Sequence, residues 1–179
     1  MAWTQDISDG VVLIRRLEPA DAAPWAQAFR DDPELGASIG VERDPTEADA
    51  AAQIAEAARS TQPESLAIAD AATGEFRGVI GLYQRDVRHR RGEIGVWLVP
   101  SARSQCIASK ALALFTTWAF DAFALDRVEL TTTPDNIATR RLARKLGFQE
   151  EGVLRARNLE RGRRVDVVML AVLRGEWSR

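Results

Sequence analysis

The sequence predicts one domain of the α/β (α+β) class, in which helices cover a mixed sheet. Three observations carry this prediction. A strand pattern at residues 92–99 runs through a short polar loop directly into a long helical pattern at residues 107–123. Strand and helix patterns continue along the chain in the order β-α-α-β-β-β-α-β-α-β-β. No repeat, low-complexity tract or linker interrupts them, so we expect residues 1–179 to form a single domain.

The first half is predicted to contain a strand, two helices and a hairpin. Residues 11–17 read as a strand, and residues 18–29 follow as a helix with a proline near its first turn. Prolines and glycines make residues 30–43 irregular. An alanine-rich helix at residues 46–59 opens on a threonine–aspartate capping pair. Residues 66–83 contain two short strands around a turn and form an antiparallel hairpin.

The second half contains the stronger patterns. Residues 92–99 alternate and end at a proline, which cannot donate to a sheet ladder. Residues 127–133 form a strand that leads through an asparagine N-cap into a helix at residues 137–146. Residues 148–173 make a last long hairpin. The apolar stripe of the helix at residues 107–123 is predicted to be Ile107, Ala111, Leu114, Phe115, Trp118, Ala122 and Phe123.

Composition and charge limit the function. The chain is 46% hydrophobic and 28% charged, with a formal net charge of −2, so no basic surplus indicates nucleic-acid binding. No apolar run is long enough to cross a membrane, and no secretory signal is visible. A single cysteine and a single histidine exclude an internal disulfide and argue against a metal site. We expect a cytoplasmic protein without metal, nucleic-acid or membrane partners.

The polar loop at residues 101–105 is the first functional signal. A loop that opens directly into a helix leaves free backbone N–H groups at the positive end of the helix dipole. Helix starts of this kind bind phosphate. We therefore interpret residues 91–123 as the binding site for the pyrophosphate of an acyl-CoA.

Four segments carry a resemblance to a known family: GEIGVWLVPSAR, DRVELTTTPDNIATRRLARKLGF, EEGVLRARNLERGRRVDVVML and VLRGEW. In this order they resemble the GNAT superfamily of N-acetyltransferases, and most of all its ribosomal-protein alanine N-acetyltransferases. The resemblance covers nearly the whole chain. It implies a mostly antiparallel seven-stranded sheet with helices on both faces. The parallel strands at residues 92–99 and 127–133 would splay apart at the acyl-CoA site.

By this resemblance, the pantetheine arm of acetyl-CoA pairs with main chain near Trp97, Leu98 and Val99. The pyrophosphate loop departs from the family pattern R/Q-x-x-G-x-G/A, because Cys106 replaces a glycine and Ser104 replaces another frequent glycine. Ordinary helical dihedrals at Cys106 would let its side chain point away, whereas a positive φ would lower acyl-CoA affinity. The loop residues are Arg103, Ser104, Gln105, Cys106, Ile107 and Ala108.

Acyl transfer from a thioester to an amine needs a base, a donor for the oxyanion and a proton for the leaving thiolate. Glu93 is the candidate base, and its alternative is an ion-paired or solvent-facing strand residue. By resemblance, an N–H near Leu98 or Val99 faces the thioester carbonyl. Asn136 would contact pantetheine and Thr139 would donate to the leaving sulfur. Their alternatives are a plain N-cap and an exposed helix residue.

The expected function is transfer of an acetyl group from acetyl-CoA to a primary amine by direct attack in a ternary complex. The acceptor is either a protein N-terminus or a small-molecule amine. Two alternatives stay open: a GNAT-fold binding or regulatory module with a degenerate pyrophosphate loop, and an enzyme that uses another acyl donor. A homodimer is compatible with the resemblance, since relatives often dimerise.

Overall fold

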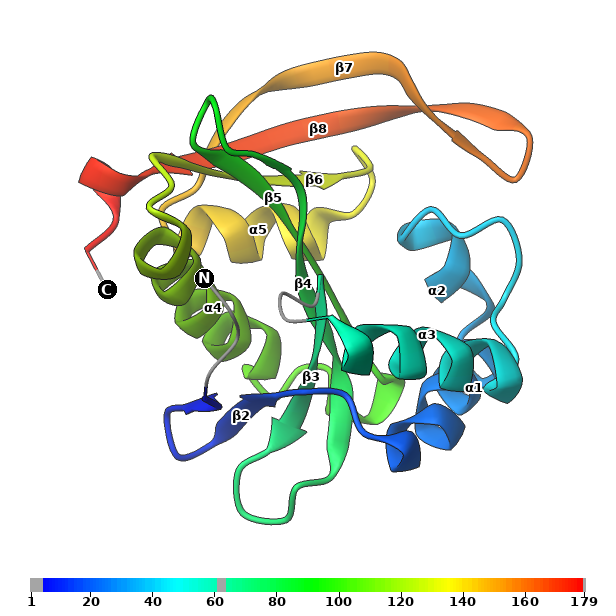
Figure 1. Cartoon of the computed structure of the whole chain (residues 1–179). Coiled ribbons are helices and arrows are strands. Elements are labelled where there is room, and N and C mark those ends of the chain that lie inside the picture. The colour runs from blue at the N-terminus through cyan, green and yellow to red at the C-terminus, as the bar shows by residue number, and fades with distance from the viewer. Residues whose placement is uncertain (1–4, 61–63, 179) are drawn as a thin grey trace.

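The structure is a computed structural model that describes residues 5–60 and 64–178. Its strands form one mixed sheet in the order β1-β2-β3-β4-β5-β6-β8-β7, in which only β5 and β6 are parallel (Figure 1). This confirms the predicted mostly antiparallel sheet. The strands are β1 (Ile7–Ser8), β2 (Val12–Arg15), β3 (Ser65–Asp70), β4 (Phe76–Asp86), β5 (Arg91–Leu98), β6 (Arg127–Thr132), β7 (Gln149–Glu160) and β8 (Arg163–Leu173).

The described residues form eight strands, one more than the resemblance implied. The additional strand is β1, whose Ile7 and Ser8 pair with Ile14 and Leu13 of β2. Two residues are too few to show an alternating pattern in the sequence, so this edge strand could not be predicted.

Helices lie on both faces of the sheet, as expected. α1 and α3 lie on one side of the central strands, and α4 and α5 lie on the other (Figure 1). None of the described helices is both long and apolar enough to span a membrane. The helices are α1 (Ala22–Asp31), α2 (Pro33–Ser38), α3 (Glu47–Arg59), α4 (Ile107–Phe123) and α5 (Ile137–Lys145), with short 3₁₀ helices at Pro19–Asp21, Pro100–Ala102 and Arg174–Glu176.

The short helix α2 corrects the expectation that residues 30–43 are irregular. Pro33 stands at its first position, where the missing N–H costs nothing because the first turn has no intrahelical acceptors. Asp32 caps the turn, since its Oδ1 accepts a hydrogen bond from the N–H of Glu34 at 3.0 Å. The proline that looked like a breaker therefore starts a helix.

The predicted helix caps are present. The hydroxyl of Thr46 accepts from the N–H of Asp49, and the carboxylate of Asp49 accepts from the N–H of Thr46. The side chain of Asn136 accepts from the N–H of Thr139 at 3.1 Å. Gly147 follows α5 with a φ of +99°, the left-handed conformation that ends many helices. These ends are fixed by local sequence.

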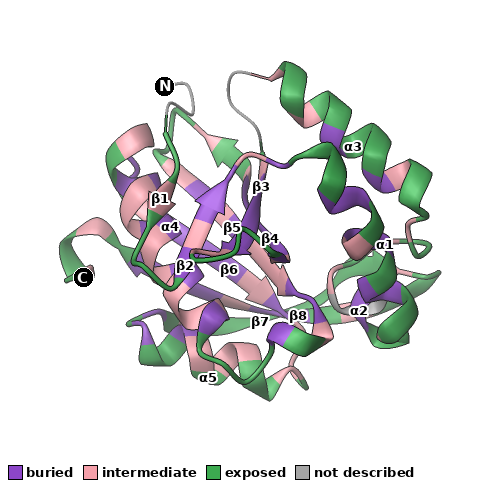
Figure 2. Cartoon of the chain, turned by 90° about the horizontal axis from the view of Figure 1, so that it is seen from below, coloured by how far each residue is buried: buried purple, intermediate pink, exposed green. Residues whose placement is uncertain are grey.

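The core lies between the sheet and the helices on its two faces, while β7 is exposed along almost its whole length (Figure 2). The buried side of α4 is wider than the predicted stripe. Ile107, Ala111 and Phe115 are buried as predicted, but Leu112 and Phe120 are also buried. The predicted Leu114, Trp118 and Phe123 are only partly buried and pack around the edge of this side.

One buried ion pair joins the first strand to the first helix. Both guanidinium nitrogens of Arg15 bind the carboxylate of Asp21, at 2.8 and 2.9 Å. The residues are 8% and 3% exposed, and Asp21 also accepts from the N–H of Glu18. The hydrogen bond to Asp21 raises the pKa of Arg15, so the guanidinium stays charged inside the protein.

Candidate active site

The two parallel strands separate and leave a fork in the sheet. β5 and β6 pair only at Arg91–Arg127, Gly92–Val128 and Glu93–Glu129. Beyond these pairs, β5 continues alongside β4, and β6 continues alongside β8. The predicted splaying is therefore confirmed. The fork opens at the carboxyl ends of the strands, where open sheets bind ligands.

A large cleft of ≈ 1490 Å³ contains the fork and extends along the sheet toward α1, α2 and α3. Among its lining are most of the residues predicted to bind the cofactor or to act in catalysis: Glu93, Trp97, Leu98, Arg103, Ser104, Cys106, Ile107, Ala108, Asn136 and Thr139. The structure therefore gathers residues from β5, the following loop, α4 and α5 around one cavity.

Val99 and Gln105 are the predicted site residues that do not line the cleft. The N–H of Val99 donates to the carbonyl of Arg77 on β4 at 2.9 Å, so it is not free for a thioester carbonyl. Because neighbouring residues of a strand direct their N–H groups to opposite edges, Leu98 keeps its N–H toward the fork. The side chain of Gln105 turns back to donate to the carbonyl of Ser101.

The loop before α4 adopts a glycine-like backbone without glycine. Ser104 has a φ of +64°, and Cys106, the N-cap of α4, has a φ of +61°. This left-handed conformation costs an L-residue roughly 1–2 kcal/mol. Cys106 is exposed and makes no side-chain cap, so the first N–H groups of α4 remain without a capping side chain. The structure therefore shows at Cys106 the positive φ that was expected to lower acyl-CoA affinity, and not ordinary helical dihedrals.

Arg103 is already engaged within the protein. Its Nη1 forms an ion pair with Asp32 at 2.6 Å, and its Nη2 donates to the carbonyl of Leu98 at 3.2 Å. Asp32 also ends α1 and caps α2. One carboxylate thus connects the helices on one wall of the cleft to the loop on the other.

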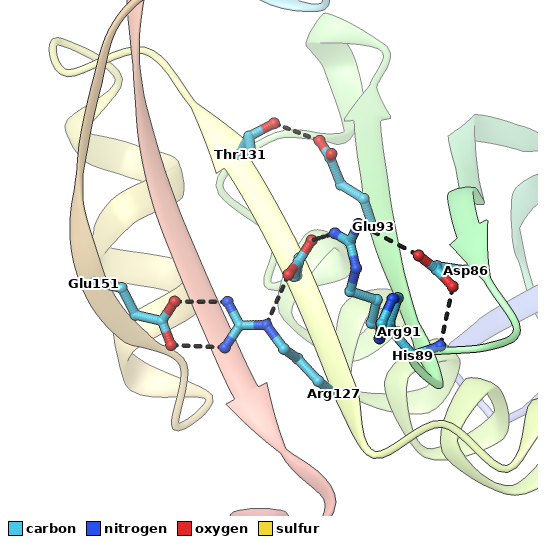
Figure 3. Close-up of polar contacts among 8 residues, drawn as sticks. Asp86, His89, Arg91, Glu93, Arg127, Thr131 and Glu151 are labelled. Atoms are coloured by element: carbon cyan, nitrogen blue, oxygen red, sulfur yellow. Dashed lines mark hydrogen bonds and ion pairs between the residues drawn. The ribbon is translucent and has the colours of Figure 1, made fainter.

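Glu93 stands at the point where the strands separate. Its carboxylate accepts a hydrogen bond from the hydroxyl of Thr131, which reaches across from β6 (Figure 3). Glu93 forms no ion pair within the described residues, so the alternative of an ion-paired strand glutamate is not what the structure shows.

An ionic network closes the base of the fork below Glu93. Buried Glu129 accepts from Arg91 at 3.1 Å and from Arg127 at 2.7 Å, and Arg127 also binds Glu151 at 2.7 and 2.6 Å (Figure 3). Arg127 lowers the pKa of Glu151 by hydrogen bonding to its charged form. The network fixes the lower ends of both strands and leaves Glu93 facing the cleft.

Helix α5 brings Asn136 and Thr139 to the fork. The carbonyl oxygen of the Asn136 side chain is used as an N-cap, which leaves its amide group available.

Tyr83 is a cleft residue that the sequence reasoning did not assign. Its hydroxyl lies 2.9 Å from the hydroxyl of Ser65 on β3. Its ring lies over Gly95, where an added Cβ would come within 2.8 Å of it. Burial raises the pKa of Tyr83, so the phenol is neutral at physiological pH. The sequence did contain a signal for this packing: Gly81 and Gly95, which pair across β4 and β5, leave room for the ring of Tyr83.

A family model for the acetyltransferase (GNAT) domain matches residues 12–149. Together with the fork, the cleft and the loop before α4, this match shows that the chain belongs to the GNAT acetyltransferase family. By its family it is therefore an acyl-CoA-dependent N-acyltransferase.

Individual relatives agree with this assignment. The chain is 28% identical over 171 residues to the "Putative ribosomal N-acetyltransferase YdaF" of Bacillus subtilis (strain 168), covering 93% of each protein. It is 33% identical over 102 residues to the "Uncharacterized N-acetyltransferase YoaA" of the same organism, where the match spans 57% of this chain and 58% of that relative. Mycobacterium smegmatis RimJ, solved in complex with CoA-disulfide, shares the fold with a TM-score of 0.84 at 24% identity, covering 99% of this chain and 91% of that chain.

Proposed function

We propose that this enzyme transfers the acetyl group of acetyl-CoA to the α-amino group of a protein N-terminus by direct attack. The observation that carries the proposal is the fork itself. Glu93 faces the cleft at the point where β5 leaves β6, and the uncapped start of α4 borders the same cleft. A base and an anion seat therefore border the gap in which a thioester and an amine would meet. The proposal places the reaction in the cytoplasm.

The proposed cofactor contacts follow from this geometry. The pyrophosphate would bind the N–H groups at the start of α4, which a helix dipole makes favourable for anions. The pantetheine arm would lie in the fork and use the free main-chain edge near Leu98. The amide of Asn136 would contact the same arm. The positive φ of Cys106 is the case in which the missing glycine weakens binding, so the proposal expects a lower affinity for acetyl-CoA than a glycine at this position would give.

The proposed chemistry assigns one group to each requirement. Glu93 would accept the proton of the amine, directly or through water. The N–H of Leu98 would stabilise the developing oxyanion, and the hydroxyl of Thr139 would donate to the leaving sulfur. An α-amino group titrates at about pH 7.7–8.0, so a carboxylate is a sufficient base near neutral pH.

Two points support a protein N-terminus as the acceptor. A relative aligned over most of the chain is named a ribosomal N-acetyltransferase. The cleft, at ≈ 1490 Å³, also exceeds the roughly 300–1,000 Å³ of a typical small-molecule pocket. It therefore has room for an extended peptide besides the acyl arm.

Calorimetry with acetyl-CoA, followed by mass spectrometry of N-terminal peptides after incubation, tests the proposal. We expect binding of acetyl-CoA and a single acetyl group on the peptide α-amine. Absence of acetyl-CoA binding at millimolar concentration would overturn the proposal and favour a binding or regulatory module. Binding with transfer only from longer acyl-CoAs or carrier-protein thioesters would identify a different donor.

A further inference from the structure

The cleft is also lined by Gly40, Glu42 and Arg43 between α2 and α3 and by Asn158 and Glu160 at the end of β7. The α2–α3 segment and the tip of the β7–β8 hairpin face each other in Figure 1, and we call this part of the cleft the outer arm. Arg161 at the hairpin tip forms an ion pair with Asp44 at 2.6 Å. Glu160 lies beside Gly40, with its Oε1 4.0 Å from the place of an added Cβ. At Gly36, Asp44 and Arg161 fill the space that a side chain would need. Residues far apart in sequence therefore form the two walls of this arm.

The charge on the cleft lining is one-sided. Arg43 binds both carboxylate oxygens of Asp49, at 2.7 and 2.8 Å, and Arg103 is paired with Asp32. Lys145 at the end of α5 also lines the cleft. Several carboxylates of the lining make no ion pair with any residue in the described ranges: Glu34, Glu42, Glu64, Glu93 and Glu160.

The fork and the family assignment already identify the active site without these carboxylates. The carboxylates instead influence which acceptor binds in it. Like charges in a cleft with low-dielectric walls repel one another and attract a cation. The reacting amine gives its proton to Glu93 in the fork, so it does not reach Glu160, which pairs with Arg163 five residues along β8 from Val168, the last partner of β6. The compensating charge must come from another part of the acceptor.

Resting on the proposed function, we propose that the acceptor is a protein N-terminus with an arginine or lysine among its first few residues. Glu42 on the α2–α3 segment and Glu160 at the hairpin end contact that charge from opposite walls of the outer arm. They are specificity-determining residues, and the catalytic group remains Glu93.

Short peptides of equal length test this inference. They share an N-terminal alanine and differ only in whether the third and fifth residues are arginine, glutamine or glutamate. Arginine replaces lysine in the probes so that the α-amine is the single acceptor. We expect kcat/KM for the arginine peptide to exceed that for the glutamine peptide by about three- to tenfold at low salt. The advantage should shrink as salt screens the charges.

Paired variants assign the preference to the two glutamates. The double variant Glu42→Gln and Glu160→Gln should bring the arginine and glutamine peptides to equal kcat/KM. Glu42→Lys should move the preference toward the glutamate peptide. Glu56→Gln removes one negative charge from an exposed position of α3 outside the cleft, so it should leave the preference unchanged.

The outcomes separate the two claims. Equal acetylation of all three peptides by the wild-type enzyme would overturn the charge preference and leave the proposed N-terminal acetylation standing. Binding of acetyl-CoA without acetylation of any peptide would overturn the proposed acceptor, and the preference with it. A preference that Glu56→Gln abolishes as fully as the cleft variants would be an effect of net charge and would overturn the assignment to Glu42 and Glu160.

Discussion

The hydroxyl of Thr131 donates a hydrogen bond to the carboxylate of Glu93 across the gap between β6 and β5. Glu93 is the last residue of β5 that pairs with β6, and Thr131 lies just beyond Glu129, its partner on β6. A carboxylate held in this way keeps a fixed direction into the cleft without being neutralised by a cation. This geometry suits a base that must be both oriented and able to take up a proton.

Glu93→Gln keeps the shape of the side chain and removes its basicity. We expect kcat/KM to fall by about 10²- to 10⁴-fold, as for loss of a general base, while the Kd for acetyl-CoA stays unchanged. Steady-state kinetics and calorimetry measure the two quantities. Thr131→Val is the matched control, because it removes only the orienting hydrogen bond, and it should cost about fivefold. A full rate with Glu93→Gln would exclude Glu93 as the base.

Cys106→Gly should stabilise the protein. A left-handed backbone costs cysteine roughly 1–2 kcal/mol, while glycine loses about 0.5–1 kcal/mol through the entropy of the unfolded chain. The net gain in the free energy of unfolding is therefore about 0.5–1 kcal/mol, and Ser104→Gly should behave alike. Urea denaturation gives the values. The Kd for acetyl-CoA should also fall, because the backbone can approach phosphate more closely.

A glycine at an ordinary helical position provides the comparison for these two variants. Ala113→Gly within α4 should lower the free energy of unfolding by about 1 kcal/mol. If Cys106→Gly destabilised the protein as much as Ala113→Gly does, the left-handed geometry of the loop would be wrong.

Asp21→Asn should be costly because it leaves the Arg15 guanidinium charged and unpaired in the interior. Breaking a buried pair on one side costs about 3–5 kcal/mol. The double variant Arg15→Met with Asp21→Leu should lose much less free energy of unfolding than the sum of the losses of Arg15→Met alone and Asp21→Leu alone. Denaturant titration of the wild type, these two single variants and the double variant checks this. Additive losses would show that the pair contributes no coupling.

The pH dependence of stability should include a contribution from Glu151. Its folded-state pKa is lowered, mainly by the hydrogen bonds from Arg127. A lowered folded-state pKa stabilises the protein above the unfolded carboxyl pKa of about 4.3, and this stabilisation is lost as the pH falls through the folded value. The Tm of Glu151→Gln should therefore fall less steeply than that of the wild type below about pH 5. Glu56 is an exposed carboxylate outside the network, so the Tm of Glu56→Gln should depend on pH as steeply as that of the wild type.

Local signals explain which parts of the fold could be predicted. The caps at Thr46 and Asn136 depend on contacts three residues apart, and the end of β5 depends on the proline that follows it. Each is settled within a few residues, so a pattern in the sequence suffices. β1 and α2 were missed because each has too few residues to show a period, and Pro33 was interpreted as a breaker where it starts a turn.

The cleft could be predicted only in part, for the opposite reason. The fork lies within one continuous stretch of the chain, residues 91–132, so a resemblance carried by that stretch could indicate it. The ion pairs of Arg103 with Asp32 and of Arg161 with Asp44 join distant segments. No local sequence pattern around either partner predicts these pairs. Tyr83 was passed over because its place depends on which strand lies beside β4.

Asp32 has a consequence for any survey of variants by activity alone. The same carboxylate finishes one helix, starts the next and holds the arginine of the loop. Replacement of Asp32 would weaken both the α1–α2 wall of the cleft and the loop before α4. Turnover and melting temperature would therefore fall together in one variant. A screen would then score it among the residues that touch acetyl-CoA, although its contacts in the structure are all with the protein itself.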